Sequence, residues 1–450
     1  MESLEDLLGK TVDNCPCGRP HRIPTREAHL QPGSLQRLPE MAERLLAPGT
    51  LLCVADTNTW AAAGERAAEM LRENGKTVDV HFVDRRIQPA HADRETVDTL
   101  AAAIRRTRAA AVMAVGSGTI NDVAKSAATL VERPLVTVAT AASMNGYPSA
   151  ISALTVDGVK TTEPCRPPVG IVADPEILAT APGRMTGAGF GDLLSKNAST
   201  ADWMVSHALD GEYYCSFSAA VAEEAVNRCI ENAGAIRENR VEGLGILAEG
   251  LLRSGVSMVI AGSSAPASGG EHLISHLWDM TAHWSGRKPA LHGEQTGVTT
   301  LISLKLYEKI LALDAATLRK RLRERPAESP AAFTNRMRDL FRDIAESILP
   351  FARQKYLDGP ALQERRKRIL ARWEKVRRAV ASVAIPAETS RAHLESAGAV
   401  SRAADLGISH AELVFAYRNA RWIRNRYTVL DLVDELGVLE EWQEEVLAGV

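Results

Sequence analysis

Two histidines four residues apart stand in the segment GGEHLISHLWDM, which covers residues 269–280. On a helix this spacing places His272 and His276 on one face, where both rings could bind the same metal ion. The HExxH motif of metalloproteases has the same spacing, with its glutamate between the histidines. Here Glu271 precedes the first histidine, so the segment is not that motif. Two interpretations stay open: a two-histidine chelate, or one ligand and one histidine with another role.

Two further segments carry a potential ligand beside glycines. Asp192 follows three glycines in GAGFGDLLSKNAS (187–199), and His292 precedes a glycine in ALHGEQTGVTT (290–300). An aspartate at a helix start is often an N-cap, and a lone histidine is often a core or surface residue. Together with His272, however, these residues form a candidate metal triad. Two imidazole nitrogens and one carboxylate leave coordination positions open for a substrate.

A glycine turn in AVGSGTINDVAKSAA (114–128) lies between an apolar run and a helical stretch. Gly116 and Gly118 would let the backbone approach a ligand, and the helix start after Thr119 would offer free N–H groups to a pyrophosphate. The third position of a G-x-G-x-x-G motif is Asn121 here, and tight turns also use glycine without any ligand.

The next segment, ATAASMNGYPSA (139–150), is either a loop that wraps a nucleotide or substrate or a plain crossover. A dinucleotide site combined with an open metal site indicates metal-assisted hydride transfer to or from a carbonyl.

The elements that position these residues alternate between strand and helix in the first part of the chain. Apolar strands that alternate with helices predict a parallel sheet covered on both faces, with ligands at the carboxyl ends of the strands. The predicted strands are 50–56, 76–83, 109–116 and 134–140, and the predicted helices are 59–75, 92–107 and 120–132.

After an Asp-Gly hairpin turn in ALTVDGVKTTE (153–163), the pattern changes. Asp174 and Pro175 predict a helix start, and almost only helical periodicity follows. We therefore expect an α/β dinucleotide-binding domain over residues 1–174 and an all-α metal- and substrate-binding domain over residues 175–450.

Composition excludes several other classes of protein. The 450 residues are 45% hydrophobic and 24% charged with a net charge of -3, which favours neither nucleic acid nor an anionic membrane as a partner. The basic runs within 317–378 are interpreted as solvated helix faces. The start of the chain has no signal-peptide pattern, and no run of about 18 apolar residues was found, so we expect a cytoplasmic protein without a membrane span.

The six cysteines are scattered, with one C-x-C in CPCGRPH (15–21). His21 would complete a weak metal site there. Because no second cysteine pair stands at zinc-site spacing, we favour an exposed N-terminal turn.

Six segments in this order, GSGTINDVAK, TAASMNGYPS, VGIVADPEIL, GAGFGDLLSK, GGEHLISH and LHGEQ, resemble the sn-glycerol-1-phosphate dehydrogenases, especially the bacterial type. These belong to the superfamily of dehydroquinate synthase-like enzymes and iron-dependent alcohol dehydrogenases. The resemblance covers roughly residues 10–310. It implies a dehydroquinate synthase-like fold, NAD(P)H between two domains, one divalent metal ion (zinc, nickel or iron), a small phosphorylated polyol or ketone as substrate, and a homodimer.

The resemblance also implies residue roles. Asp192, His272 and His292 match the metal ligands, and His276 matches a substrate contact. Asp56 matches the adenosine ribose contact, and TNTW after it lacks an arginine for a 2′-phosphate, which favours NAD. The remaining cofactor positions are Gly116, Gly118, Thr119, Ile120, Asn121, Asp122, Thr140, Ser143 and Ser149.

One position departs from the family. Asn145 stands where the family carries an aspartate that faces the substrate, so charge and basicity are lost there. The main hypothesis is a reversible reduction of dihydroxyacetone phosphate to sn-glycerol 1-phosphate, with Lys196 or Lys160 suggested for the substrate phosphate. The alternatives are a polyol or phosphonate alcohol dehydrogenase, a dehydroquinate synthase-like cyclase (a lyase), and a non-catalytic regulator.

Overall fold

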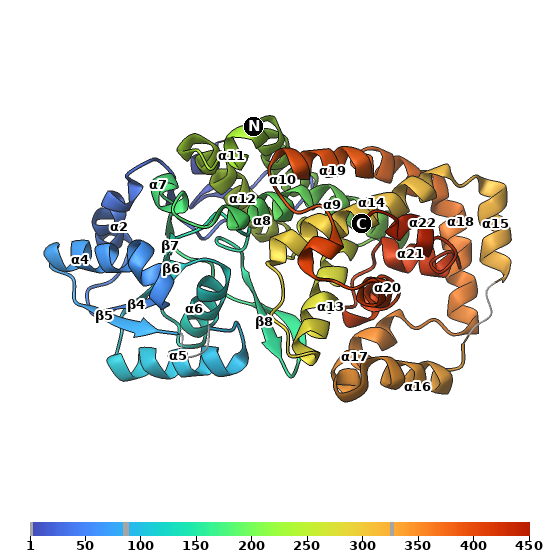
Figure 1. The fold of residues 1–450 in the computed structure, drawn as a ribbon, viewed down its shortest axis with the longest axis horizontal. Coiled ribbons are helices and arrows are strands. Elements are labelled where there is room, and N and C mark those ends of the chain that lie inside the picture. The colour runs from blue at the N-terminus through green and yellow to red at the C-terminus, as the bar shows by residue number, and fades with distance from the viewer. Residues whose placement is uncertain (1–2, 84–89, 325–327) are drawn as a thin grey trace.

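The computed structural model describes residues 3–83, 90–324 and 328–450 (Figure 1). A parallel sheet of six strands forms the centre of the N-terminal half, which confirms the predicted fold class. All four predicted strands are present, and the sheet has two further three-residue strands at one edge. In sheet order the strands are β3 (Glu27–His29), β10 (Gly170–Val172), β7 (Leu135–Ala139), β6 (Ala111–Gly116), β4 (Leu51–Ala55) and β5 (Val78–Phe82).

Helices cover both faces of this sheet, because side chains alternate between the faces along each strand. The face that carries Val54 packs against α5 (Arg94–Thr107) and α6 (Gly118–Leu130). The opposite face packs against α2 (Leu38–Leu45) and α4 (Glu65–Glu73). The helices on the two faces do not cover the carboxyl ends of the central strands, where ligands bind in sheets of this kind.

The hairpin predicted from Asp-Gly is confirmed. Strands β8 (Ile151–Val156) and β9 (Val159–Pro164) pair antiparallel, and the turn residues Asp157 and Gly158 both have positive φ. In Figure 1 this hairpin stands between α6 and α13 (Gly270–Trp284), and Val159 joins the core of the helical half. The hairpin therefore connects the two halves of the protein.

From Pro175 onward the described residues form helices and turns. The α-helices are α7 (Pro175–Leu178), α8 (Gly183–Leu194), α9 (Lys196–Asp210), α10 (Ser216–Glu231), α11 (Ala233–Arg237), α12 (Val241–Ala261), α13, α14 (His292–Ala312), α15 (Ala315–Glu324), α16 (Pro330–Phe341), α17 (Ala345–Lys355), α18 (Gly359–Ala381), α19 (Ala387–Ser396), α20 (His410–Asn419), α21 (Val429–Glu435) and α22 (Gln443–Leu447). Short helical turns complete the chain at α3 (Thr57–Thr59), η1 (Ser34–Arg37), η2 (Trp60–Gly64), η3 (Arg342–Ile344), η4 (Ala403–Leu406) and η5 (Ala420–Ile423).

Helix α12 is long and apolar enough to cross a membrane by length and composition alone, although Glu242, Glu249 and Arg253 interrupt its apolar residues. In this structure 78% of its apolar window is buried. Its glycines allow close contacts, since a Cβ at Gly243 would lie 2.4 Å from the carbonyl carbon of Ala235 in α11. At Gly250 a Cβ would lie 2.9 Å from Cys229 Sγ in α10. Here α12 is thus a core helix.

The N-terminal segment packs on the helical half before it enters the sheet at β3. Helix α1 (Leu4–Leu7) and the strands β1 (Thr11–Val12) and β2 (His21–Arg22) place Ile23 in one core with residues of α10 and α12. The division of the chain at residue 174 stays a proposal, supported by the end of β10 at Val172 and the start of α7 at Pro175.

Two expectations from the sequence are only partly right. In the CPCGRPH turn Pro16, Gly18, Arg19 and Pro20 are exposed, but Cys15 and His21 are only 7% and 5% exposed. The basic runs are only in part solvated: Arg365 of α18 forms ion pairs with Asp210 and Glu435, and Arg372 donates to the Ala208 carbonyl. These arginines fasten α18 to neighbouring helices.

Candidate active site

Three side chains from three helices converge in the helical half. Asp192 lies on α8, His272 near the start of α13, and His292 is the first residue of α14. One donor atom from each lies within 4.8 Å of the others, and His272 Nε2 is 3.9 Å from Asp192 Oδ1. Two imidazole nitrogens and a carboxylate at this spacing fit a single divalent ion with open coordination positions.

Glycines explain why these helices approach so closely. A Cβ at Gly293 would lie 1.9 Å from the Ala188 carbonyl oxygen, and one at Gly191 would lie 2.4 Å from the Gly293 oxygen. Helices α8 and α14 therefore cross with their backbones in contact. The crossing brings Asp192 beside His292.

The charges around the triad suit a cation. Burial alone would raise the pKa of Asp192, but the Lys196 ammonium, 2.8 Å away, lowers that pKa to about 2. Burial lowers the pKa of His272 and His292, so both rings are neutral near neutral pH and keep a lone pair for a metal.

Glu271 orients the first histidine. Its Oε1 lies 2.8 Å from His272 Nδ1 and also accepts the Gly269 N–H at 2.8 Å. This contact leaves Nε2 of His272 directed toward Asp192. Burial raises the pKa of Glu271 to about 7. A carboxylate behind a histidine is a common partner of metal ligands, and its role was not predicted from the sequence.

His276 lies one turn further along α13 and is not part of the triad that the geometry groups. Its ring stacks on that of His292 with a centroid distance of 5.7 Å. Its buried Nδ1 has no hydrogen-bond partner among the described residues. The residue borders the cavity described next, which places His276 beside a ligand bound there.

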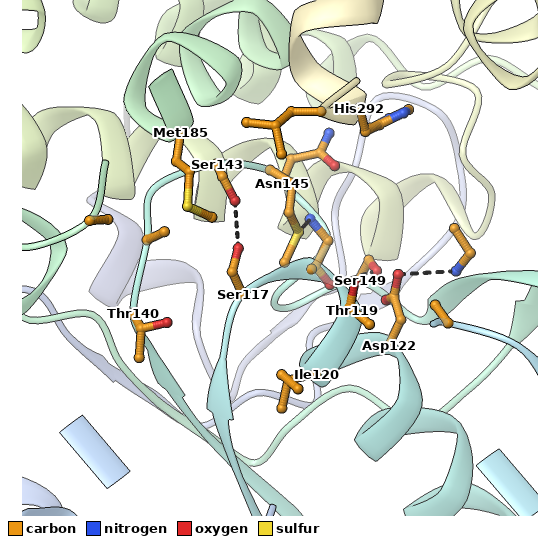
Figure 2. Close-up of a pocket in the computed structure, with 18 of the residues that line it drawn as sticks. Ser117, Thr119, Ile120, Asp122, Thr140, Ser143, Asn145, Ser149, Met185 and His292 are labelled. Carbon is orange, nitrogen blue, oxygen red and sulfur yellow. Dashed lines mark hydrogen bonds between the residues drawn. The ribbon is translucent and has the colours of Figure 1, made fainter. Parts of the chain in front are cut away.

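A cavity of about 700 Å³ lies between the two halves (Figure 2). The predicted site residues that line it are Asp56, Gly118, Thr119, Ile120, Asp122, Thr140, Ser143, Asn145, Ser149, His272, His276 and His292. Gly116 and Asn121 lie behind the wall. Gly116 packs on Ile120, where a Cβ would lie 2.6 Å away, and Asn121 is fully buried, with Oδ1 accepting from Thr137 at 3.3 Å.

The turn between β6 and α6 offers an anion site at one wall. Helix α6 starts at Gly118, and its N-cap residue Ser117 makes no capping hydrogen bond with its side chain. The first N–H groups of α6 are therefore available to a phosphate, with the helix dipole in support. Ser117 instead bonds Ser143 across the cavity wall (Figure 2).

The two lysines suggested for the substrate phosphate differ in position. Lys196 is buried and donates to Asp192, Ser195 and the Ala267 carbonyl, so its ammonium is already engaged and does not border the cavity. Lys160 of β9 borders the cavity. The suggestion of Lys196 is thus wrong, and that of Lys160 stays open.

Asn145 links the loop after β7 to the triad. Its backbone N–H donates to Asp192 Oδ2 at 2.9 Å, and its side-chain amide donates to Ser254 Oγ at 3.1 Å. The loop after β7 is therefore fastened to Asp192 on α8.

Comparison with known proteins agrees with this geometry. A family model described as iron-containing alcohol dehydrogenase matches residues 29–182. The glycerol-1-phosphate dehydrogenase [NAD(P)+] of Halalkalibacterium halodurans is 35% identical over 314 residues, which cover 68% of this chain and 77% of that protein. The protein of the same name from Bacillus velezensis is 31% identical and covers 86% of this chain and 85% of its own length.

The chain belongs to the glycerol-1-phosphate dehydrogenase family. The resemblance drawn from its six motifs is confirmed by these relatives, which include an archaeal one from Pyrococcus furiosus, 36% identical over 63% of this chain and 78% of that protein. The fold agrees with a solved probable glycerol dehydrogenase of Sinorhizobium meliloti, at a TM-score of 0.61 and 17% identity, covering 93% of this chain and 97% of that chain.

Other residues of this family member support the site without having been predicted. Lys125 of α6 is fully buried and donates to the Gly146 carbonyl at 2.7 Å, Ser149 Oγ at 3.0 Å and the Ile151 carbonyl at 2.6 Å. It therefore holds the 146–151 loop against the dinucleotide turn. A lysine among small residues in VAKSAA was the only sequence signal.

The C-terminal segment also reaches the site. Arg426 donates to Ser264 Oγ at 2.9 Å and to the Ser268 carbonyl, and both serines border the cavity. Arg424 donates to the carbonyl of Lys160. No sequence motif indicated these contacts, since they join segments far apart in the chain.

Proposed function

We propose that this chain is a metal-dependent NAD(P)H oxidoreductase that interconverts dihydroxyacetone phosphate and sn-glycerol 1-phosphate. One observation carries the proposal. The carboxylate and two imidazoles of Asp192, His272 and His292 meet beside a cavity, and both histidines and the uncapped start of α6 border that cavity. The family relatives carry that activity in their names.

The triad is the proposed metal site. When bound, the divalent ion supplies a Lewis acid that polarises the substrate carbonyl, and the reduced nicotinamide supplies the hydride. Asp192 stays ionised because Lys196 compensates its charge, and His272 and His292 stay neutral through burial. The protein therefore offers the ion one negative charge and two neutral donors without a proton to displace.

The cofactor is proposed to lie along the carboxyl ends of β4, β6 and β7. Asp56 would accept hydrogen bonds from the adenosine ribose, and its charge favours NAD over the 2′-phosphate of NADP. Gly118, Thr119, Ile120 and Asp122 would border the pyrophosphate. Thr140, Ser143 and Ser149 would border the nicotinamide, while Gly116 and Asn121 would shape the turn from behind.

The substrate is proposed to lie between the nicotinamide and the triad. His276 would contact its hydroxyl through the unpartnered Nδ1, and Lys160 would pair with its phosphate. Asn145, which is neutral, would orient a hydroxyl by hydrogen bonding and would not remove a proton.

The test is NADH consumption by the purified protein with dihydroxyacetone phosphate, together with elemental analysis. We expect turnover that is lost when the metal is removed and restored when it returns. Loss of turnover and of the metal ion held by this triad is expected for Asp192→Ala and for His292→Ala. Full activity of Asp192→Ala after metal stripping would reject the metal role.

A second candidate follows from Asn145. Because the family's acid is missing at this position, a related polyol or phosphonate could replace glycerol 1-phosphate as substrate. A panel of phosphorylated and unphosphorylated ketones separates the two candidates. Consumption of NADH with another ketone but not with dihydroxyacetone phosphate would favour the second.

We also propose a cytoplasmic homodimer without nucleic-acid or membrane partners. None of the six cysteines, all within the described residues, forms a disulfide, which supports a reducing compartment. The homodimer is supported by the resemblance to the family. Light scattering of the purified protein tests it, and the mass of a single chain would contradict it.

A further inference from the structure

A second group of metal-binding side chains lies apart from the active site, between the N-terminal segment and α10. Cys15 and Cys17 occupy the turn between β1 and β2, and His21 begins β2. Cys215 is the N-cap residue of α10. Three thiols and one imidazole from segments far apart in the chain thus meet in one place.

Three distances among the four donor atoms lie close to those of a tetrahedral site. Cys15 Sγ lies 3.5 Å from Cys215 Sγ, and His21 Nε2 lies 3.1 Å from Cys17 Sγ and 3.7 Å from Cys215 Sγ. All four atoms lie within 4.8 Å of one another. Zinc with ordinary bond lengths would separate two sulfurs by about 3.8 Å and a sulfur from a nitrogen by about 3.5 Å.

The surroundings of this group suit bound thiolates. The Tyr213 hydroxyl donates to Cys17 Sγ at 3.1 Å, and the Arg19 guanidinium lies 3.9 Å from the centre of the Tyr213 ring. The Ser218 N–H donates to Cys215 Sγ at 3.4 Å, at the positive end of the α10 dipole. Donors of this kind stabilise the negative charge that three thiolates bring to an ion.

We propose that Cys15, Cys17, His21 and Cys215 bind a structural zinc ion. Four protein ligands fill the tetrahedron, so no position is open for a substrate. On binding, the three thiols release their protons to solvent and the neutral imidazole donates its lone pair. Cys15, His21 and Cys215 are buried, whereas Cys17 is half-buried and provides the path of entry.

The ion would fasten the N-terminal segment to the helical half. The segment continues from His21 to β3, the edge strand of the sheet. The N-terminal segment therefore connects both halves, and the zinc would anchor its first part to α10 through Cys215. Its role is separate from the catalytic ion, whose ligands are nitrogen and oxygen.

The test separates this ion from the catalytic one. The Asp192→Ala protein, expressed with zinc, is expected to retain about one zinc per chain by elemental analysis, because only the catalytic site is lost. With cobalt in place of zinc, the same protein is expected to show the intense sulfur-to-cobalt charge-transfer absorption that a nitrogen and oxygen site lacks.

Cys17→Ser is the main variant, because Cys17 is the ligand with the greatest exposure and its loss leaves the core intact. In the Asp192→Ala background it should abolish the sulfur-to-cobalt band and lower zinc content at least tenfold. Cys165→Ser, a thiol on the hairpin side, is the matched control and should leave both unchanged.

Two results would overturn the proposal. One is an Asp192→Ala protein that folds by circular dichroism yet holds no zinc and gives no sulfur-to-cobalt band. The other is an intact mass, measured without reductant, that shows a disulfide between Cys15 and Cys215. Both measurements use the full chain and do not depend on whether dihydroxyacetone phosphate is the substrate.

Discussion

At the scale of single residues, Glu271 orients His272, one of the proposed metal ligands. Its Oε1 lies 2.8 Å from Nδ1 of His272, which leaves Nε2 for the proposed ion. Because such a partner orients the ring and raises its basicity, its removal typically lowers metal affinity by about 10- to 100-fold. We predict that loss for Glu271→Ala, measured by competition with a chelator. Glu271→Gln keeps a hydrogen-bond acceptor in place, so its metal affinity should lie between those of the wild type and Glu271→Ala. An unchanged metal affinity of Glu271→Ala would contradict the orienting role of Glu271.

Lys196 provides a second prediction at this scale, concerning stability and pH. In the metal-free protein, Asp192 has a pKa of about 2, below its ordinary value of 3.8. A carboxyl with a lowered pKa stabilises the fold above the unfolded pKa, and this contribution of roughly 2 kcal/mol is lost as pH falls from about 4 to 2. Urea unfolding across that range measures it.

Lys196→Met removes the largest of the causes that lower the pKa of Asp192. It leaves a buried carboxylate unpaired, so we expect the metal-free variant to lose about 3–5 kcal/mol of unfolding free energy at neutral pH. The loss of unfolding free energy between about pH 4 and pH 2 should also disappear in this variant. A variant with the wild-type pH profile would show that Lys196 does not hold the pKa of Asp192 down.

At the scale of elements, the crossing of α8 and α14 sets the distance between two proposed ligands. A methyl group at Gly293 would overlap the Ala188 carbonyl, so Gly293→Ala must push the helices apart and move His292 from Asp192. We predict loss of the catalytic metal and a stability loss of at least 1–3 kcal/mol. Elemental analysis and urea unfolding measure the two effects.

Gly183→Ala is the matched control on α8, because a Cβ there meets no atom within 4 Å. It should keep metal and stability. If Gly293→Ala bound metal as well as Gly183→Ala does, the crossing could not be what sets the ligand distance.

At the scale of the whole molecule, the C-terminal segment forms part of the cavity wall. Arg426 holds Ser264 and Ser268 from a distant part of the chain. We predict that Arg426→Met lowers kcat/KM roughly tenfold by loosening this wall, with metal content unchanged. Arg402→Met, at an exposed surface position, should have no effect. Loss of metal in Arg426→Met would instead indicate a defect in the fold.

The strands, the hairpin and the residues of the candidate site could be predicted from local sequence patterns and from the order of the motifs. Buried apolar runs predicted β4, β6 and β7, and Asp-Gly predicted the hairpin turn. The strands β3 and β10 were missed because three residues are too few for a periodic signal. The sequence also predicted that Asp192, His272 and His292 act together, and the structure brings them together through a helix crossing that spacing alone does not reveal.

Contacts between distant segments could not be predicted from one sequence. Cys215 stands 200 residues after Cys15, so in the sequence the C-x-C near the N terminus has no partner at zinc-site spacing. Arg365 and Arg372 carry the same charge pattern as a solvated helix face, but carboxylates and carbonyls of neighbouring helices lie against them. Burial and ion pairing at such positions depend on tertiary packing.

The place of β3 in the sheet has a consequence for how the chain folds during synthesis. β3 is the first strand of the sheet to emerge, yet its partner in the sheet is β10, which ends at Val172. A nascent chain that has produced β4 to β7 can pair those strands while β3 is still unpaired. The strand that is synthesised first is thus the last to pair, because β10 must first leave the ribosome with nearly the whole N-terminal half.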